Sequence, residues 1–207
     1  MKRTLLLALL ALALPMSVFA SSNSVDFTNS GGTLTGSSSG LSLSGSTLIA
    51  VNGLNGLGLV TGSLGSVTFS TGSFASGNAQ MGGTLNTGGS FVVWSSGSNG
   101  LPSGNLFNGS FTCSASSPCT WMKTTDAKGD NRYTLTANIS GTWYNGTTVA
   151  GTAVQLTIST GKNLFNGTVT ISSGDTNVST VPEPGTLGLL GTGLIGVVGV
   201  LRRKLKS

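Results

Sequence analysis

The chain has 207 residues, of which 33 are Gly, only 7% are charged and none is His. The lack of His excludes Ser-His-Asp and Cys-His catalysis, imidazole metal ligands and the usual near-neutral proton shuttle. The net charge of +5 would suit a nucleic-acid-binding protein. However, the excess cations lie within the first three residues and within 202–206, and four cations balance four anions between residues 21 and 181. The sequence therefore predicts a neutral body with no nucleic-acid partner.

Residues 1–20 have the pattern of a secretory signal peptide. Lys2 and Arg3 precede an apolar run at 5–14, and small residues mark a cleavage point between Ala20 and Ser21. A helix of ten residues rises about 15 Å, which is too short for the roughly 30 Å core of a bilayer. A permanent transmembrane helix is therefore the weaker alternative, and we expect an exported chain that begins at Ser21.

The body, 21–180, has the composition of a β protein. It is rich in Ser, Thr, Gly and Asn with interspersed Val, Leu, Ile and Phe, and such a composition disfavours helices. Apolar and polar residues alternate over 133–139, 154–158 and 165–171, which predicts half-buried strands. We expect an all-β, antiparallel, β-sandwich-like body, with a Gly/Ser-rich β-solenoid as the alternative.

Two short patterns refine this expectation. Six Asn-Gly pairs predict tight turns, because these residues tolerate positive φ. The segment 105–112 is echoed at 163–170, and each copy begins with the pentapeptide Asn-Leu-Phe-Asn-Gly. This repeat indicates either two similar strands or a coincidence in a biased composition.

Cys113 and Cys119 are the only cysteines, with five residues between them. In an exported chain this spacing favours a local disulfide over a reactive redox pair. The bond would close a short loop and contribute about 2 kcal/mol. Without His the pair cannot complete a zinc site.

Asp126 and Asp130 flank a turn, with a calcium site as the alternative. We expect no metal and no cofactor.

Four aromatic residues are candidates for stacking on sugar rings, and the alternative is that they belong to the core. They are Trp94, Trp121, Trp143 and Tyr144. Glycoside hydrolysis needs two carboxylates facing a sugar, and no Asp or Glu of the body lies in a recognisable motif. The sequence therefore predicts that the protein is not an enzyme.

The last 27 residues divide into three parts: a Pro-Glu-Pro segment at 181–184, an uncharged stretch at 185–201 and a basic tail at 202–207. The 17 residues of the uncharged stretch would rise about 25 Å as a helix, a marginal transmembrane span. The positive-inside rule keeps the basic tail in the cytoplasm and places the body outside. The residues that define these parts are Val181, Pro182, Glu183, Pro184, Arg202, Arg203 and Lys204.

This order of parts resembles the PEP-CTERM sorting signal of exported bacterial proteins. The resemblance implies recognition by an exosortase, a membrane-embedded transpeptidase-like enzyme, with cleavage near the Pro-Glu-Pro. It also implies a precursor anchored in the inner membrane of a Gram-negative bacterium, transfer of the body to the cell surface or medium, and an association with exopolysaccharide. A plain membrane anchor behind a Pro-rich stalk is the alternative.

These observations together predict a non-enzymatic surface or extracellular-matrix protein. A carbohydrate-binding module is the alternative, and a glycan hydrolase is the least favoured one.

Overall fold

The structure, a computed structural model, describes residues 23–180, which form thirteen strands and two short 3-10 turns. The expected signal peptide, sorting motif, transmembrane helix and basic tail lie outside the described residues. The strands are β1 (Asn23–Ser30), β2 (Thr33–Ser37), β3 (Gly40–Asn52), β4 (Val60–Thr71), β5 (Phe74–Asn78), β6 (Gly82–Leu85), β7 (Gly88–Ser96), β8 (Ser103–Phe111), β9 (Cys119–Thr125), β10 (Asn131–Trp143), β11 (Thr148–Gly161), β12 (Thr168–Thr170) and β13 (Ser173–Thr180), and the turns are η2 (Leu54–Gly56) and η3 (Ser98–Gly100).

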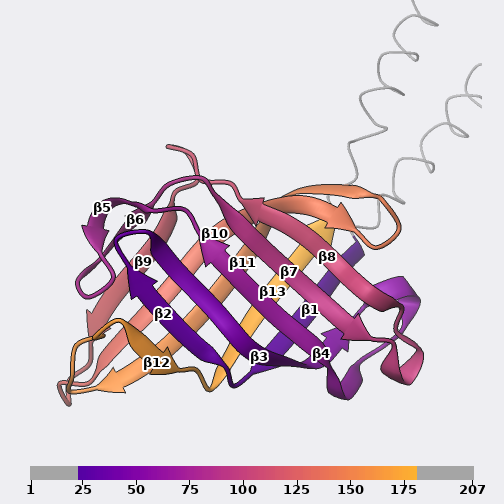
Figure 1. Ribbon diagram of the computed structural model, residues 1–207, viewed down its shortest axis with the longest axis horizontal. Helices are drawn as coiled ribbons and strands as arrows, with labels where there is room; N and C mark the ends of the chain where they lie inside the picture. The colour runs from indigo at the N-terminus through magenta and orange to yellow at the C-terminus, as the bar shows by residue number, and fades with distance from the viewer. Residues whose placement is uncertain (1–22, 181–207) are drawn as a thin grey trace, which may run out of the picture. The chain divides into compact units, whose positions relative to one another are not determined.

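The sheet closes on itself. Its ring follows the order β1–β3–β4–β7–β8–β10–β11–β13, and β13 pairs again with β1. In Figure 1, β3, β4, β7 and β8 cross in front of β10, β11 and β13. Every described pairing is antiparallel. The predicted all-β antiparallel class is confirmed, and the parallel stacking of a β-solenoid does not occur among these strands.

The two ends of the closed sheet differ. At one end, which we call the terminal end, Asn23 pairs with Thr180, and the turns η2 and η3 lie beside them. The opposite end, which we call the distal end, carries four connections: the β2–β3 turn at 38–39, the β5–β6 turn at 79–81, the β9–β10 turn at 126–130 and the 162–167 loop. The chain therefore enters and leaves the sheet at the same end.

The distal half of the body resembles a sandwich. There, β12–β2–β3 form one sheet, β11–β10–β9–β6–β5 form the other, and no described pairing joins β3 to β5 or β11 to β12. The side chains of Leu34 and Leu41 are buried on the first sheet, and those of Trp121 and Tyr133 are buried on the second. The two sheets merge into a single ring toward the terminal end.

Apolar side chains, which alternate with polar ones along the strands, fill the interior. On β10, Tyr133, Leu135, Ala137 and Ile139 are buried, as the sequence pattern predicts. The pattern at 165–171 predicts a longer strand than the structure contains, because only 168–170 pair, as β12. Phe165 is nevertheless buried, since the 162–167 loop folds inward over the distal end.

Aromatic rings pack against one another at both ends of this interior. Near the terminal end, Trp143 packs against Phe27 and Phe107, with ring centroids 5.8 and 5.7 Å away. Near the distal end, Trp121 stacks on Tyr133 at 5.3 Å. Such contacts add about 0.5–1.5 kcal/mol per pair to the free energy of burial. They therefore help to stabilise the core that the closed sheet surrounds.

Two buried aromatic side chains hold the distal connections in place. The indole N–H of Trp121 donates to the carbonyl of Ala79 at 2.7 Å. The hydroxyl of Tyr133 donates to the carbonyl of Gln80 at 2.8 Å and accepts the backbone N–H of Phe165 at 3.0 Å. One phenol oxygen thus joins the β5–β6 turn to the 162–167 loop.

Replacing Tyr133 with Phe should lower the free energy of unfolding by about 1–3 kcal/mol, because the Phe165 N–H and the Gln80 carbonyl lose a buried partner. Urea denaturation measures this change. Tyr144→Phe is the matched control, since the Tyr144 hydroxyl donates to Asn55 Oδ1 in an exposed bond; its loss should cost less than about 1 kcal/mol. Equal losses in the two variants would contradict the role given to Tyr133.

Candidate functional site

The structure divides the four aromatic residues proposed to stack on sugars. Trp121 and Trp143 are buried in the core, so neither can present its ring to a ligand, and the core alternative holds for them. Trp94 is 42% exposed and Tyr144 is 39% exposed.

Among residues 23–180, no ring contact joins Trp94 to Tyr144. Trp94 lies on β7 opposite Asn105. Tyr144 follows β10, and its hydroxyl reaches Asn55 of η2 at 2.7 Å. Trp94 therefore offers a ring on the outside of the sheet, whereas Tyr144 connects two turns at the terminal end.

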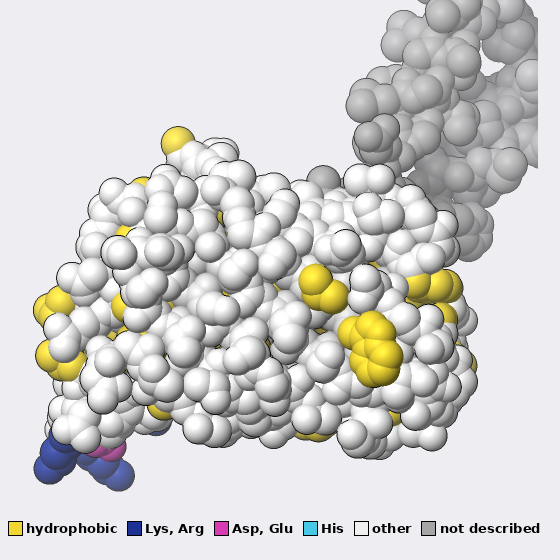
Figure 2. All heavy atoms as spheres, in the orientation of Figure 1, with side chains coloured by type: hydrophobic (Ala, Val, Ile, Leu, Met, Phe, Trp, Pro, Cys, Tyr) yellow, Lys and Arg dark blue, Asp and Glu magenta, His cyan; other side chains and the backbone are white. Residues whose placement is uncertain are grey.

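All four cations of the described chain lie at the distal end. Lys128, Arg132 and Lys162 are exposed and Lys123 is half-buried. On the face shown in Figure 2, the visible Lys and Arg side chains gather at one corner, while most of the surface is uncharged and its apolar patches are isolated. None of the four cations forms an ion pair with another residue of 23–180.

The anions at this end have a structural role. Asp126 Oδ1 accepts the backbone N–H groups of Lys128 and Asp130, at 2.8 and 3.0 Å. This is the turn predicted from the sequence. No group of three His, Cys, Asp or Glu side chains that could hold a metal ion exists among residues 23–180.

A shallow hollow of about 480 Å³ lies at the distal end. Its lining comes from the β2–β3 turn, the β5–β6 turn and the 162–167 loop. The polar side chains of the lining are Ser37, Ser38, Asn78, Gln80 and Asn166, and Phe165 lies beneath them. Lys162 belongs to the same loop as Phe165 and Asn166, but none of the four cations lines the hollow.

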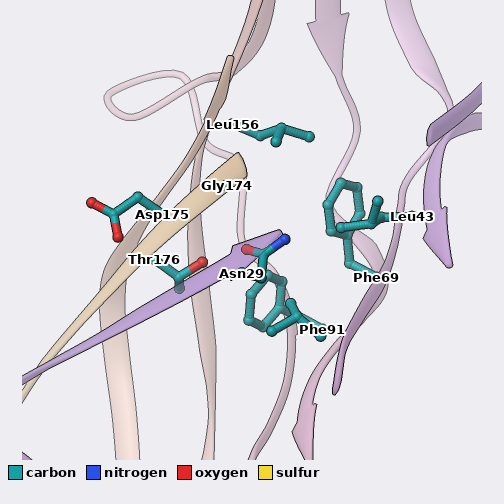
Figure 3. A pocket seen from close by; sticks show the side chains of 9 residues that line it. Asn29, Leu43, Phe69, Phe91, Leu156, Gly174, Asp175 and Thr176 are labelled. Carbon is teal, nitrogen blue, oxygen red and sulfur yellow. The ribbon is translucent and has the colours of Figure 1, made fainter. Parts of the chain in front are cut away.

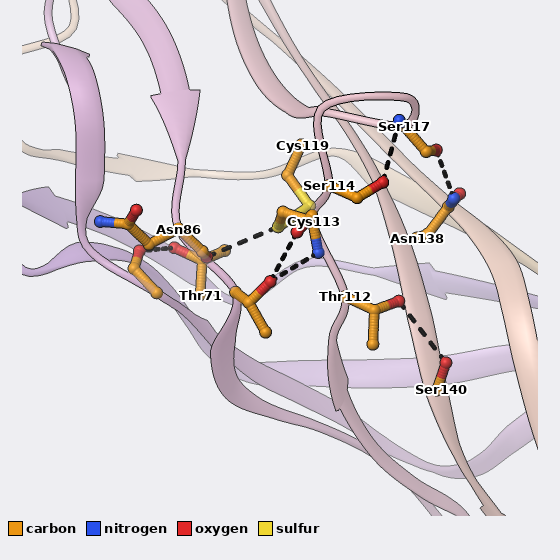
Figure 4. Close-up of a disulfide and its surroundings, with 11 residues drawn as sticks. Thr71, Asn86, Thr112, Cys113, Ser114, Ser117, Cys119, Asn138 and Ser140 are labelled. Carbon is orange, nitrogen blue, oxygen red and sulfur yellow. Dashed lines mark hydrogen bonds between the residues drawn. A yellow bond between two sulfur atoms is a disulfide. The ribbon is translucent and has the colours of Figure 1, made fainter.

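The predicted disulfide is present between Cys113 and Cys119, with Cα atoms 5.1 Å apart. It closes a loop that interrupts one edge of β10, where β8 pairs before the loop and β9 pairs after it. Figure 4 shows this loop hydrogen-bonded to neighbouring strands. The N–H of Cys113 donates to Thr87 Oγ1 at 2.9 Å, and the Thr87 hydroxyl donates to the Cys113 carbonyl at 2.7 Å. The disulfide therefore closes the loop between β8 and β9, two strands that pair with successive parts of β10.

A second hollow, of about 540 Å³, lies along this loop and is lined by Thr84, Thr87, Cys113 and Pro118 among others. No carboxylate lines this hollow or the distal one. The interior also contains a cavity of only about 10 Å³ beside Asn29, room for about one water molecule. In Figure 3 the carboxylate of Asp175, which borders that cavity, points away from it.

Asp26 and Asp175 form a pair of like charges on adjacent strands, β1 and β13. Burial raises the pKa of Asp26 above its usual range, and the negative charge of Asp175 and a hydrogen bond with it raise it further. Thr28 also donates to Asp175 Oδ1, at 3.4 Å. The fold therefore favours the protonated form of Asp26.

Because the folded state holds this proton more tightly than the unfolded state does, the contribution of Asp26 to stability is largest at acidic pH. It is lost as the pH rises through the raised pKa. Asp26→Asn should therefore increase the free energy of unfolding at neutral pH and weaken its decline between acidic and neutral pH. Urea denaturation across that range tests this, and lower stability of the variant at pH 7 would contradict it. Asp175→Asn should give a change of the same sign.

No helix within 23–180 has the length and apolar character needed to cross a bilayer. The sorting residues Val181, Pro182, Glu183 and Pro184, the basic residues Arg202, Arg203 and Lys204, and the cleavage residues Ala20 and Ser21 all lie outside the described residues.

Comparison with known proteins bears on the tail. No curated protein and no solved structure matches the chain. Residues 180–204 match the family model of the PEP-CTERM protein-sorting motif. The motif supports an exported protein that an exosortase sorts to the cell surface. The resemblance seen in the sequence is thus confirmed, and the chain carries a PEP-CTERM sorting signal at its carboxyl end.

Proposed function

We propose that this chain is a non-enzymatic cell-surface or matrix protein whose tail an exosortase cleaves at the Pro-Glu-Pro segment. The observation that carries the proposal is the match of residues 180–204 to the sorting motif. All thirteen described strands lie within 23–180, on the amino-terminal side of the Pro-Glu-Pro segment. Cleavage at that segment leaves every described strand in place.

The residues of the motif suit a protease-like recognition site. Pro182 and Pro184 fix φ and remove two backbone donors, and each disfavours a helical conformation in the residue before it. Glu183 is the only charged residue between Asp175 and Arg202. An extended segment with one carboxylate is a distinctive substrate beside a membrane.

The anchoring and destination of the body form part of the same proposal. Before cleavage, 185–201 would span the inner membrane of a Gram-negative cell, with Arg202, Arg203 and Lys204 in the cytoplasm. After cleavage, the body would remain at the surface or in the exopolysaccharide-containing matrix. Its surface supports a passive role, because most of the exposed side chains are Ser, Thr and Asn.

A carbohydrate-binding module is the second candidate. The exposure of Trp94, at 42% on the outside of β7, favours it, because an exposed aromatic face is suited to stacking against an apolar sugar face. A glycan hydrolase is less favoured, since its carboxylates would have to line a hollow, and neither of the two larger hollows has one.

Glu183→Ala should abolish processing of the tail. Intact-mass measurement of the protein from cells that express the exosortase should show wild-type chains that end near residue 184 and variant chains that retain 185–207. Asp175→Asn is the matched control, because it removes one carboxylate from β13 without touching the motif. An unchanged mass distribution in Glu183→Ala would refute recognition of the Pro-Glu-Pro segment and favour a plain membrane anchor.

Trp94→Ala tests the second candidate. If Trp94 stacks on a sugar, its loss should weaken retention on native matrix glycans by roughly fivefold to tenfold, since burial of about 40–60 Å² of apolar ring surface contributes about 1–1.5 kcal/mol. Affinity electrophoresis measures the retention. Absence of retention in the wild-type protein would count against carbohydrate binding at this face.

A further inference from the structure

We propose that the distal end of the body binds an acidic polysaccharide, with Lys128, Arg132 and Lys162 holding its carboxylate or sulfate groups. The first argument is the distribution of charge. Arg132 follows the β9–β10 turn, which contains Lys128, and Lys162 begins the loop after β11. The three side chains come from two segments, 128–132 and residue 162, and the pairing of β10 with β11 at Asn131↔Gly161 brings these segments together.

The second argument is that these cations lack an internal partner. They form no ion pair with another described residue, and they are exposed. Asp126 and Asp130 are each two residues from Lys128, and the Asp126 carboxylate is bound to two backbone N–H groups. With Lys123 and Asp130 included, the distal end has four cations and two anions, a net charge of +2, whereas Asp26 and Asp175 give the rest of the body −2.

The third argument is the hollow at the same end of the sheet. The 162–167 loop contains Lys162 and also lines the hollow through Phe165 and Asn166. The loop is held in place, because Asn131 Nδ2 donates to the carbonyls of Lys162 and Asn163 at 3.2 and 3.1 Å. A fixed surface of amide and hydroxyl groups at the same end as the cations is suited to sugar hydroxyls.

The density of charge favours a glycan over nucleic acid. Duplex DNA carries a negative charge about every 1.7 Å, and it would bring many phosphates against a body with no net charge. A polyuronate carries its charges one sugar at a time, between neutral hydroxyl groups. The distal end likewise has few cations and many neutral hydrogen-bonding groups.

The inference goes beyond the sorting function and is tested without it, because tail processing does not enter a binding measurement. The full chain, purified in detergent, is titrated with polygalacturonate as the acidic polymer, with dextran as the neutral one and with a DNA duplex. We expect binding to polygalacturonate that weakens with added salt, and weak binding or none to dextran and DNA.

The variant Lys128→Gln/Arg132→Gln/Lys162→Gln should raise the dissociation constant for polygalacturonate on the order of tenfold, the combined effect of three exposed charge contacts. The control Ser63→Asp/Thr147→Asp/Thr148→Asp changes the net charge by the same amount at exposed positions toward the terminal end. It should retain most of the affinity. Thermal unfolding verifies that both variants are folded.

Three outcomes would overturn the proposal. Equal losses in the two variants would show that net charge, and not the distal end, governs binding. Equal affinity for dextran would show that the cations are not used. Tighter binding to DNA than to polygalacturonate would assign the distal end to nucleic acid.

Discussion

Closure of the sheet between β10 and β11 is the constraint on which the rest of the body depends. Sheets with free edges are commonly protected from aggregation by charged residues along those edges. Residues 23–180 contain only eight charged side chains, half of them cations at the distal end. Closing the ring removes most of the edges that such a sequence could not otherwise protect. It also creates the interior that the alternating apolar residues fill, so a chain poor in charge can still have a large core.

The sequence predicted the class of fold because apolar and polar residues alternate strictly where one face of a strand is buried and the other is exposed to solvent. On β10, four inward positions are apolar and buried, and the antiparallel class follows from one-sided burial of this kind. Closure was not predictable, because the residues that join β10 to β11 have the same alternation as those of an open sheet. The disulfide followed from spacing and export alone, and it required no knowledge of the partner strands.

Other signals were correct at some positions and wrong at others. Two of the Asn-Gly pairs lie in turns as predicted, with φ of 55° at Asn55 and 57° at Asn99. The pair at 108–109 does not, because it lies inside β8. A Cβ at Gly109 would overlap the Ser140 carbonyl and the ring of Phe107, so this Gly permits close approach of strands, not a turn. The repeated pentapeptide likewise forms part of a strand at 105–109 and a loop at 163–167. Among the aromatics, composition could not separate buried Trp121 from exposed Trp94, because strand direction decides which way each ring points. The distal cations were visible in the sequence, but only the register of the sheet shows that they share one end.

The pairing of Asn23 with Thr180 has a mechanical consequence. Any attachment beyond Thr180 transmits force to the last strand, which is hydrogen-bonded to β1 along its whole length, from Asn23↔Thr180 to Ser30↔Ser173. If the distal end is held by another molecule, the load acts along the strands, and these backbone bonds share it in shear. Peeling, in which bonds break one after another, would require a force across the strands. The pairing of Asn23 with Thr180 thus favours a body that resists force applied between residue 180 and the distal end.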